Sequence, residues 1–184
     1  ILLLALLPLS VTAQPVERPV LPATRLDAPP ALDGDVLDDT VWQTIAAETT
    51  FTQNTPDVGL PASQRTELRV AYTDEAVFVA FVCFDDPENI IVSDARRDAD
   101  LGETDAVRFV FDTYRDTQNG FVFGTNPAGL EYDAQMSKGD ASGAGSFNRN
   151  WDGVWDVKTK IGDFGWSAEF RIPLKTLRYP TKPV

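Results

Sequence analysis

Most of the chain alternates between apolar and polar residues with a period of two, the pattern of strands that bury one face. Leu68, Val70 and Tyr72 follow this pattern. The segment 76–84 is apolar throughout, so that strand should be buried on both faces. The same reasoning predicts further strands at 107–111, 121–125, 130–136, 155–161 and 166–172.

Helical patterns are few and short. The acidic residues at 38–39 precede apolar residues at helical spacing, so a short helix is expected near Val41. Pro173 begins a second helical turn that reaches Leu177, because proline fits the first position of a helix. Asn126-Pro127-Ala128-Gly129 predicts a type I turn. Short strands separated by turns predict an all-β fold, an antiparallel β-sandwich or jelly roll with one or two short helices.

The chain divides into three parts. Residues 1–13 are aliphatic and end in small residues, which predicts a secretory signal peptide with a truncated start; a buried N-terminal strand is the alternative. Residues 14–30 carry five prolines and are interpreted as a linker or an edge-lying extended segment. The sandwich should occupy 31–180, interrupted by a flexible loop at 137–150. The protein is therefore expected to be secreted, periplasmic or outer-membrane-associated.

Composition removes several function classes. The 184 residues include no histidine and a single cysteine, Cys83, so catalytic triads, zinc sites and intrachain disulfides are excluded. The net charge of -12 argues against nucleic acid and against an anionic membrane surface. No transmembrane helix is expected, since a span needs about 20 apolar residues. We also expect no nucleotide cofactor.

Four motifs in order resemble family 9 carbohydrate-binding modules and span about residues 31–180. The resemblance implies the sandwich fold and a non-catalytic, carbohydrate-binding function with an oligosaccharide or polysaccharide as partner. It also slightly favours calcium, because these modules hold structural calcium. The motifs are Leu32-Asp33-Gly34-Asp35 with Trp42, then the segments 70–79, 105–112 and 165–173.

A closer resemblance is to the N-terminal domain of a family of large secreted bacterial proteins of unknown function, in which a long β-rich, barrel-like region follows. It implies that the chain is an N-terminal fragment, with its own C-terminal barrel as a second possible partner. The segments that carry it are 96–98, 112–116, 126–129 and 150–155.

The sugar clamp of family 9 modules does not carry over. A clamping Trp corresponds to the stretch 101–103, which contains none. A sugar-contacting Glu corresponds to Arg108, and a sugar-contacting Arg to about Gly124. Any saccharide site must therefore use other residues.

The best remaining place for a saccharide is the segment around Trp151 and Trp155, which would share a face if both lay in one strand. Sugars pack their C–H faces on aromatic rings and need polar partners for their hydroxyls. The alternative is that Trp155 belongs to the core and Trp151 anchors a loop. The predicted ligand-binding residues are Trp151, Trp155, Asp152, Asn150 and Arg97.

An acidic loop follows the second predicted strand. Oxygen-rich loops suit Ca²⁺, which takes about 6–8 oxygen ligands. The alternative is a solvated loop cross-linked by Arg96 and Arg97. The predicted ligands of a structural calcium ion are Asp98, Asp100, Glu103 and Asp105.

Other carboxylates have weaker signals. Asp112, Asp116 and Asp133 could line a polar groove or simply face water. Glu169 lies opposite the apolar face of its strand and should be structural, paired with Arg171 or Arg108.

Three functions stay open: a carbohydrate-binding module that holds a larger envelope protein on a glycan, a docking domain for a C-terminal barrel, and part of a glycoside hydrolase. Hydrolysis needs two paired carboxylates, and none stand out. Haem is not expected, because Met136 and Lys138 would point to the same face of a strand.

Overall fold

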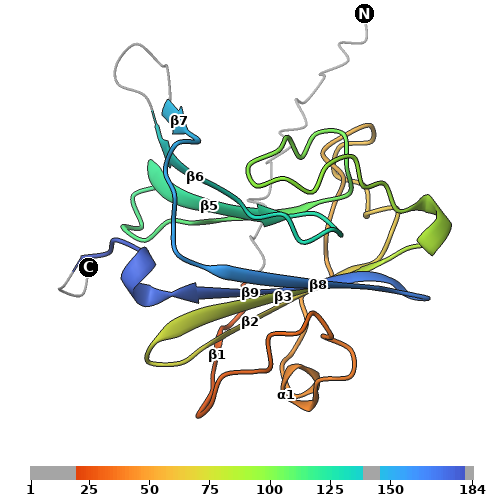
Figure 1. Ribbon diagram of the computed structural model, residues 1–184, viewed down its shortest axis with the longest axis horizontal. Helices are drawn as coiled ribbons and strands as arrows, with labels where there is room; N and C mark the ends of the chain where they lie inside the picture. Colours follow the sequence, from red (N-terminus) through yellow and green to blue (C-terminus); the bar gives the residue numbers. More distant parts are fainter. Residues whose placement is uncertain (1–19, 139–145, 181–184) are drawn as a thin grey trace, which may run out of the picture.

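The computed structural model describes residues 20–138 and 146–180, which form two β-sheets packed face to face (Figure 1). The larger sheet has the order β1-β2-β3-β9-β8 and the smaller β4-β5-β6-β7. The strands of the larger sheet are β1 (Thr24–Arg25), β2 (Thr66–Tyr72), β3 (Ala76–Phe84), β9 (Gly165–Pro173) and β8 (Asp156–Gly162). Those of the smaller sheet are β4 (Val107–Phe111), β5 (Asn119–Thr125), β6 (Tyr132–Ser137) and β7 (Ser146–Asn148).

The main core lies between the two sheets and is rich in aromatic rings. Phe170 of β9 is fully buried and meets Phe109 of β4 edge-on, with ring centroids 5.0 Å apart. Trp155 stacks on the same phenylalanine at 5.8 Å. Rings from both sheets therefore interlock, which fixes how one sheet sits on the other.

A second core covers the outer face of the larger sheet. The short helix α1 (Thr40–Gln43) lies below that sheet in Figure 1, and its Trp42 is completely buried among Phe78, Ala80 and their neighbours. Asp39 caps the helix by accepting a hydrogen bond from the backbone N–H of Val41 at 2.7 Å.

Glu169 fastens this covering segment to β9. Its Oε1 accepts from Trp42 Nε1 at 2.5 Å, and its Oε2 accepts from the backbone N–H groups of Asp33 and Gly34 at 3.0 and 2.5 Å. Gly34 has φ +90, and a Cβ there would come within 2.6 Å of the Thr159 backbone, so the motif requires glycine. Burial raises the pKa of Glu169. The predicted pairing with Arg171 or Arg108 is wrong, because Glu169 bonds neutral donors instead.

All seven predicted strands are present, and the all-β sandwich is confirmed. The helical elements also fall where expected, with η2 (Leu174–Thr176) after Pro173 and a further short turn, η1 (Pro87–Asn89). Gly129 N donates to Asn126 O at 2.9 Å, as the predicted turn requires. Among the described residues no helix is long and apolar enough to cross a membrane.

Two short strands lie where no periodic pattern predicted one. β1 lies within 14–30, where an edge-lying extended segment was one of two expectations; it pairs in parallel with β2 at the edge of the larger sheet, so the sandwich is not purely antiparallel. β7 lies within the predicted loop 137–150 and pairs with the end of β6. Each is too short to show a hydrophobic period. The predicted signal peptide at 1–13 lies outside the described residues.

Candidate functional site

The connection from β7 to β8 carries the two tryptophans that the sequence singles out. Residues 151–155 lie outside any strand, so the two indoles do not share a strand face. Trp155 is 4% exposed and belongs to the core. Its prediction as a ligand-binding residue is therefore corrected, because its ring presents no face to a ligand.

Trp151 has one side on the core and the other toward the surface. Its ring packs against Phe121 and Phe123, with centroids 4.9 and 5.9 Å away. Gly153 passes so close that a Cβ there would lie 2.7 Å from Trp151 Cη2. The indole is thus held between the core and its own loop, which fixes its orientation.

Arg97 gathers carboxylates from distant parts of the chain. Its Nη2 donates to Asp133 at 2.7 Å and to Asp152 at 2.5 Å, and its Nη1 donates to Glu131. Its Nε lies 3.6 Å from Asp98. Arg97 and Asp152, both predicted as ligand-binding residues, are brought together across 55 positions of sequence.

Asp133 is the buried member of this cluster. Its Oδ2 also accepts from Trp155 Nε1 at 2.6 Å and from the backbone N–H of Gly153 at 3.4 Å. Its Oδ1 has no hydrogen-bond partner among the described residues. Burial raises the pKa of Asp133. The hydrogen bond from the Trp155 indole N–H and the charge of Arg97 offset part of this rise. The carboxylate ties the Arg97 loop and the tryptophan connection to β6.

The predicted groove of three aspartates is not present. Asp112 accepts backbone hydrogen bonds from Asp116 and Thr117, and Asp116 accepts them from Gln118 and Asn119. Both therefore stabilise their own turn, apart from Asp133. The carboxylates face local N–H groups rather than a shared surface.

A hollow of about 350 Å³ opens beside Trp151. It lies between the β7–β8 connection and η2, which run side by side at the left of Figure 1, and Thr176 Oγ1 bonds Val154 O across it at 2.5 Å. Asn150 does not line it; its backbone N–H bonds Asn148 Oδ1 at 3.0 Å. We call this the Trp151 hollow, and its lining is Trp151, Asp152, Gly153, Val154, Lys175, Thr176 and Arg178.

The acidic loop does not converge on one point. Asp100 Oδ1 accepts from the backbone N–H of Gly102 at 2.9 Å, and Asp105 Oδ2 from that of Ile91 at 2.7 Å. Within 20–138 and 146–180 no three acidic, histidine or cysteine side chains are placed to hold a metal ion. Calcium bound by Asp98, Asp100, Glu103 and Asp105 stays a prediction.

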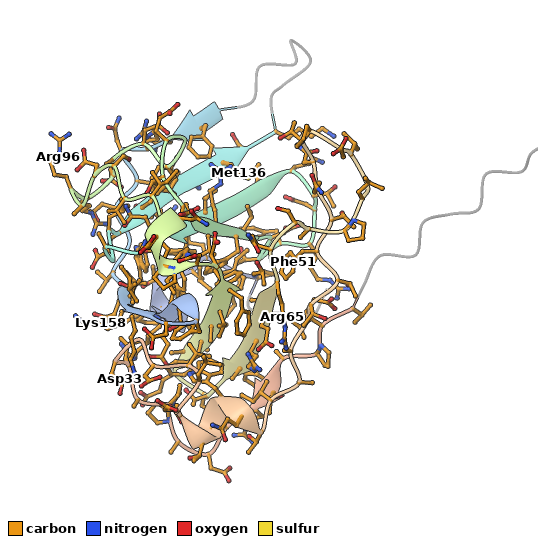
Figure 2. The ribbon with its side chains drawn as sticks, turned by 90° about the vertical axis from the view of Figure 1, so that its right-hand side faces the viewer. Asp33, Phe51, Arg65, Arg96, Met136 and Lys158 are labelled. Atoms are coloured by element: carbon orange, nitrogen blue, oxygen red, sulfur yellow. The ribbon has the colours of Figure 1, made fainter. Side chains whose placement is uncertain are left out.

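The two arginines of that loop behave differently. Arg96 bonds Asp94 within the loop, and Figure 2 shows its side chain pointing away from the body of the sandwich. Its guanidinium holds the pKa of Asp94 well below the ordinary value. Arg97 instead connects the loop to β6 and to the tryptophan connection. Of the two arginines expected to cross-link the loop, Arg96 pairs within it, and Arg97 joins it to other segments.

The positions that correspond to the family 9 sugar clamp also meet in space. Arg108 lies directly opposite Gly124 in the β4–β5 pair, and Leu101 Cδ1 lies 3.0 Å from where a Cβ of Gly124 would be. Leu101 and Arg108 border a second hollow of about 290 Å³ that Tyr132 also lines. Leu101 packs on the outer face of the sheet, against the cluster that contains Tyr132.

Two features of the site were missed from the sequence. Lys175 and Arg178 follow the last strand, where a helical turn was expected but no function. Asp133 was assigned to a water-facing side because Tyr132, Ala134 and Met136 mark the opposite face as apolar. In the structure that apolar face is the outer one, and Asp133 points inward beside Phe123. The N–H of a buried Trp155, which needs an acceptor, is the signal that could have revealed it.

The sequence matches no protein-family model and no curated protein. Among solved structures the chain is similar to a family 9 carbohydrate-binding module from Caldicellulosiruptor kristjanssonii. The glucose complex of that module has a TM-score of 0.53 at 15% identity, over 88% of this chain and 71% of the module. The cellotriose complex gives 0.55 and 17%, over 88% and 69%. The likeness confirms the fold predicted from the four motifs, a sandwich of the family 9 type.

Proposed function

We propose that this chain is a non-catalytic saccharide-binding module of an exported protein, and that the Trp151 hollow is its binding site. One observation carries the proposal: a partly buried indole borders a polar hollow in a fold whose solved relatives are bound to glucose and cellotriose. The module would hold a larger envelope protein on a glycan.

The chemistry of the hollow suits a sugar. Trp151 offers an aromatic surface for the C–H face of a pyranose ring, and its packing on Phe121 fixes that surface before binding. Asp152, Lys175 and Arg178 offer an acceptor and donors for hydroxyl groups. A volume of about 350 Å³ falls within the range of small-ligand sites.

Binding without catalysis is favoured by the carboxylates. Glycoside hydrolysis needs two carboxyl groups about 5–10 Å apart across the scissile bond. Among the described residues that line the hollow, Asp152 is the one carboxylate, and Arg97 holds it at 2.5 Å. We therefore propose a binding module and not part of a glycoside hydrolase.

A second function has one observation in its favour. Val110, Met136 and Phe147 are 49%, 36% and 47% exposed on the smaller sheet, and Met136 lies directly opposite Phe147. Exposed apolar surface of this kind marks interaction sites. Docking against a C-terminal barrel would cover it.

Isothermal titration against soluble oligosaccharides tests the proposal. The variant Trp151→Leu keeps an apolar side chain on Phe121 but removes the aromatic face, so we expect binding to fall at least tenfold, roughly the loss of one aromatic contact. The control is Tyr72→Leu, an exposed aromatic residue on β2. Circular dichroism confirms that both variants fold.

The titrations distinguish the Trp151 hollow, the second hollow and the absence of saccharide binding. Loss of binding in Trp151→Leu alone supports the Trp151 hollow. Binding that survives in Trp151→Leu and is lost in Arg108→Ala moves the site to the second hollow. A flat titration from folded wild-type protein overturns saccharide binding and leaves the docking function.

A further inference from the structure

Two cations of the Trp151 hollow have no acidic partner. Lys175 and Arg178 are exposed, and among the described residues neither forms an ion pair. Among the described residues Arg108 and Lys158 also form no ion pair, but Lys175 and Arg178 are the two cations that line the Trp151 hollow. Arg25, Arg65, Arg69, Arg96, Arg97, Lys160 and Arg171 are all paired with carboxylates.

The carboxylate of the hollow does not cancel this charge. Asp152 bonds Arg97 at 2.5 Å, and Arg97 is not among the residues that line the hollow. Arg97 is also shared with Asp133 and Glu131, and among the described residues neither Lys175 nor Arg178 is bonded to these carboxylates. Lys175 and Arg178 therefore face the hollow without a carboxylate to satisfy them.

We propose that the Trp151 hollow selects saccharides that carry carboxylate groups, such as oligosaccharides of uronic acids. This inference rests on the proposed function and names its ligand class. Trp151 receives the C–H face of a sugar ring, while Arg178 and Lys175 receive the carboxylate of that ring or of its neighbour. Arginine matches a carboxylate with a planar pair of donors, and lysine adds a point charge.

The surroundings sharpen the selection. The overall charge of -12 opposes the approach of an anionic glycan, so an acidic saccharide needs unpaired cations such as Lys175 and Arg178 where it binds. The interaction lies near the surface, so salt should weaken it. A neutral sugar would use the indole and hydrogen bonds to its hydroxyl groups, and its binding would be insensitive to salt.

The test compares trigalacturonate with its fully methyl-esterified form, and both with cellotriose, by isothermal titration at low and high salt. Esterification removes the charge and keeps the sugar rings. We expect the acid to bind at least tenfold more tightly than the ester, roughly the value of one charge-assisted hydrogen bond. Only the acid should weaken as salt rises.

Matched variants locate the effect. Lys175→Gln and Arg178→Gln should each weaken acid binding about tenfold and leave the ester unchanged. Lys158→Gln is the control, because Lys158 is an exposed cation of β8 that lines neither hollow; Figure 2 labels it. Surface substitutions of this kind leave folding almost unchanged.

The outcomes separate the two proposals. Equal binding of acid and ester overturns the acidic selection and leaves saccharide binding standing. Acid binding that is unaffected by Lys175→Gln and Arg178→Gln also overturns it. If neither the charged nor the neutral sugars bind, the proposed function itself fails.

Discussion

The two sheets of the sandwich each contain a buried carboxylate that accepts a hydrogen bond from a buried indole N–H. Glu169 and Asp133 each accept an indole N–H, from Trp42 and Trp155 respectively, and each also accepts backbone N–H groups. Burial raises the pKa of both. In each case a strand holds a loop segment through one acidic side chain.

They differ in the charge of their donors. All three hydrogen bonds that Glu169 accepts come from neutral groups, beneath a segment that closes the fold. Asp133 also bonds the Arg97 guanidinium, which is 38% exposed and is shared with other carboxylates. Glu169 therefore secures the fold, while Asp133 secures the segments that form the Trp151 hollow.

The largest expected effect comes from Glu169→Ala. The change leaves the Trp42 indole and two backbone N–H groups without an acceptor in a buried place, and each unsatisfied donor costs about 1–3 kcal/mol. We expect the free energy of unfolding to fall by at least about 3 kcal/mol, measured by urea denaturation. Glu75→Ala, at an exposed turn, should stay within about 0.5 kcal/mol of wild type. Equal effects would remove the special role of Glu169.

Asp133→Ala should cost less but should change binding. It frees the Trp155 indole and the Gly153 N–H, while Arg97 keeps its bonds to Glu131 and Asp152. We expect a loss of about 2 kcal/mol in the free energy of unfolding. Saccharide binding should also fall, because the connection that carries Trp151 is released. A variant that is destabilised but binds normally would show that Asp133 does not position the hollow.

The sequence predicted the strands that carry both carboxylates, but it did not predict which way Asp133 points. Seven strands follow from local pattern, six from a period of two and β3 from a continuous apolar run, and all seven lie where that pattern predicts them. The motif with Gly34 and Trp42 indicated the fold, but its hydrogen bonds to Glu169 were not predicted. Asp133 could not be oriented, because both faces of β6 are covered and the alternation does not say which covering is the core.

The site itself depends on contacts between distant residues. Arg97 and Asp152 were both singled out, but nothing local indicates that two residues 55 positions apart in sequence lie 2.5 Å apart. Of the two alternatives for Trp155 the core position holds, because residues 151–155 lie outside any strand and its indole is buried. Short motifs identify residues, whereas the sheet register decides which of them meet.

A smaller effect is expected from Arg97→Met, which removes the cation and keeps most of the side-chain volume. Asp133 keeps its two neutral donors, and Glu131 and Asp152 turn to water. We expect a loss of about 1 kcal/mol at neutral pH, because a part-exposed ion pair contributes little. Urea denaturation at low and high salt checks this, and salt should narrow the difference from wild type. A loss as large as that of Asp133→Ala would mean that the guanidinium, not the indole, holds the anchor.

The smallest expected effect is a change in the free energy of unfolding with pH. It should differ between Glu169 and Asp133. An acid whose pKa is raised on folding stabilises the protein most below its unfolded pKa and loses that contribution as pH rises through its folded pKa. For Glu169 the decline should start near its ordinary value of 4.5. The free energy of unfolding of wild type, relative to Glu169→Gln, should therefore fall as pH rises above that value.

For Asp133, compared with Asp133→Asn, the same decline should start near 3.8 and be shallower, because Arg97 favours the charged form. Urea denaturation between pH 4 and 8 measures both slopes. A difference that grows with pH for Glu169 would mean that its three N–H donors outweigh the cost of burying its charge.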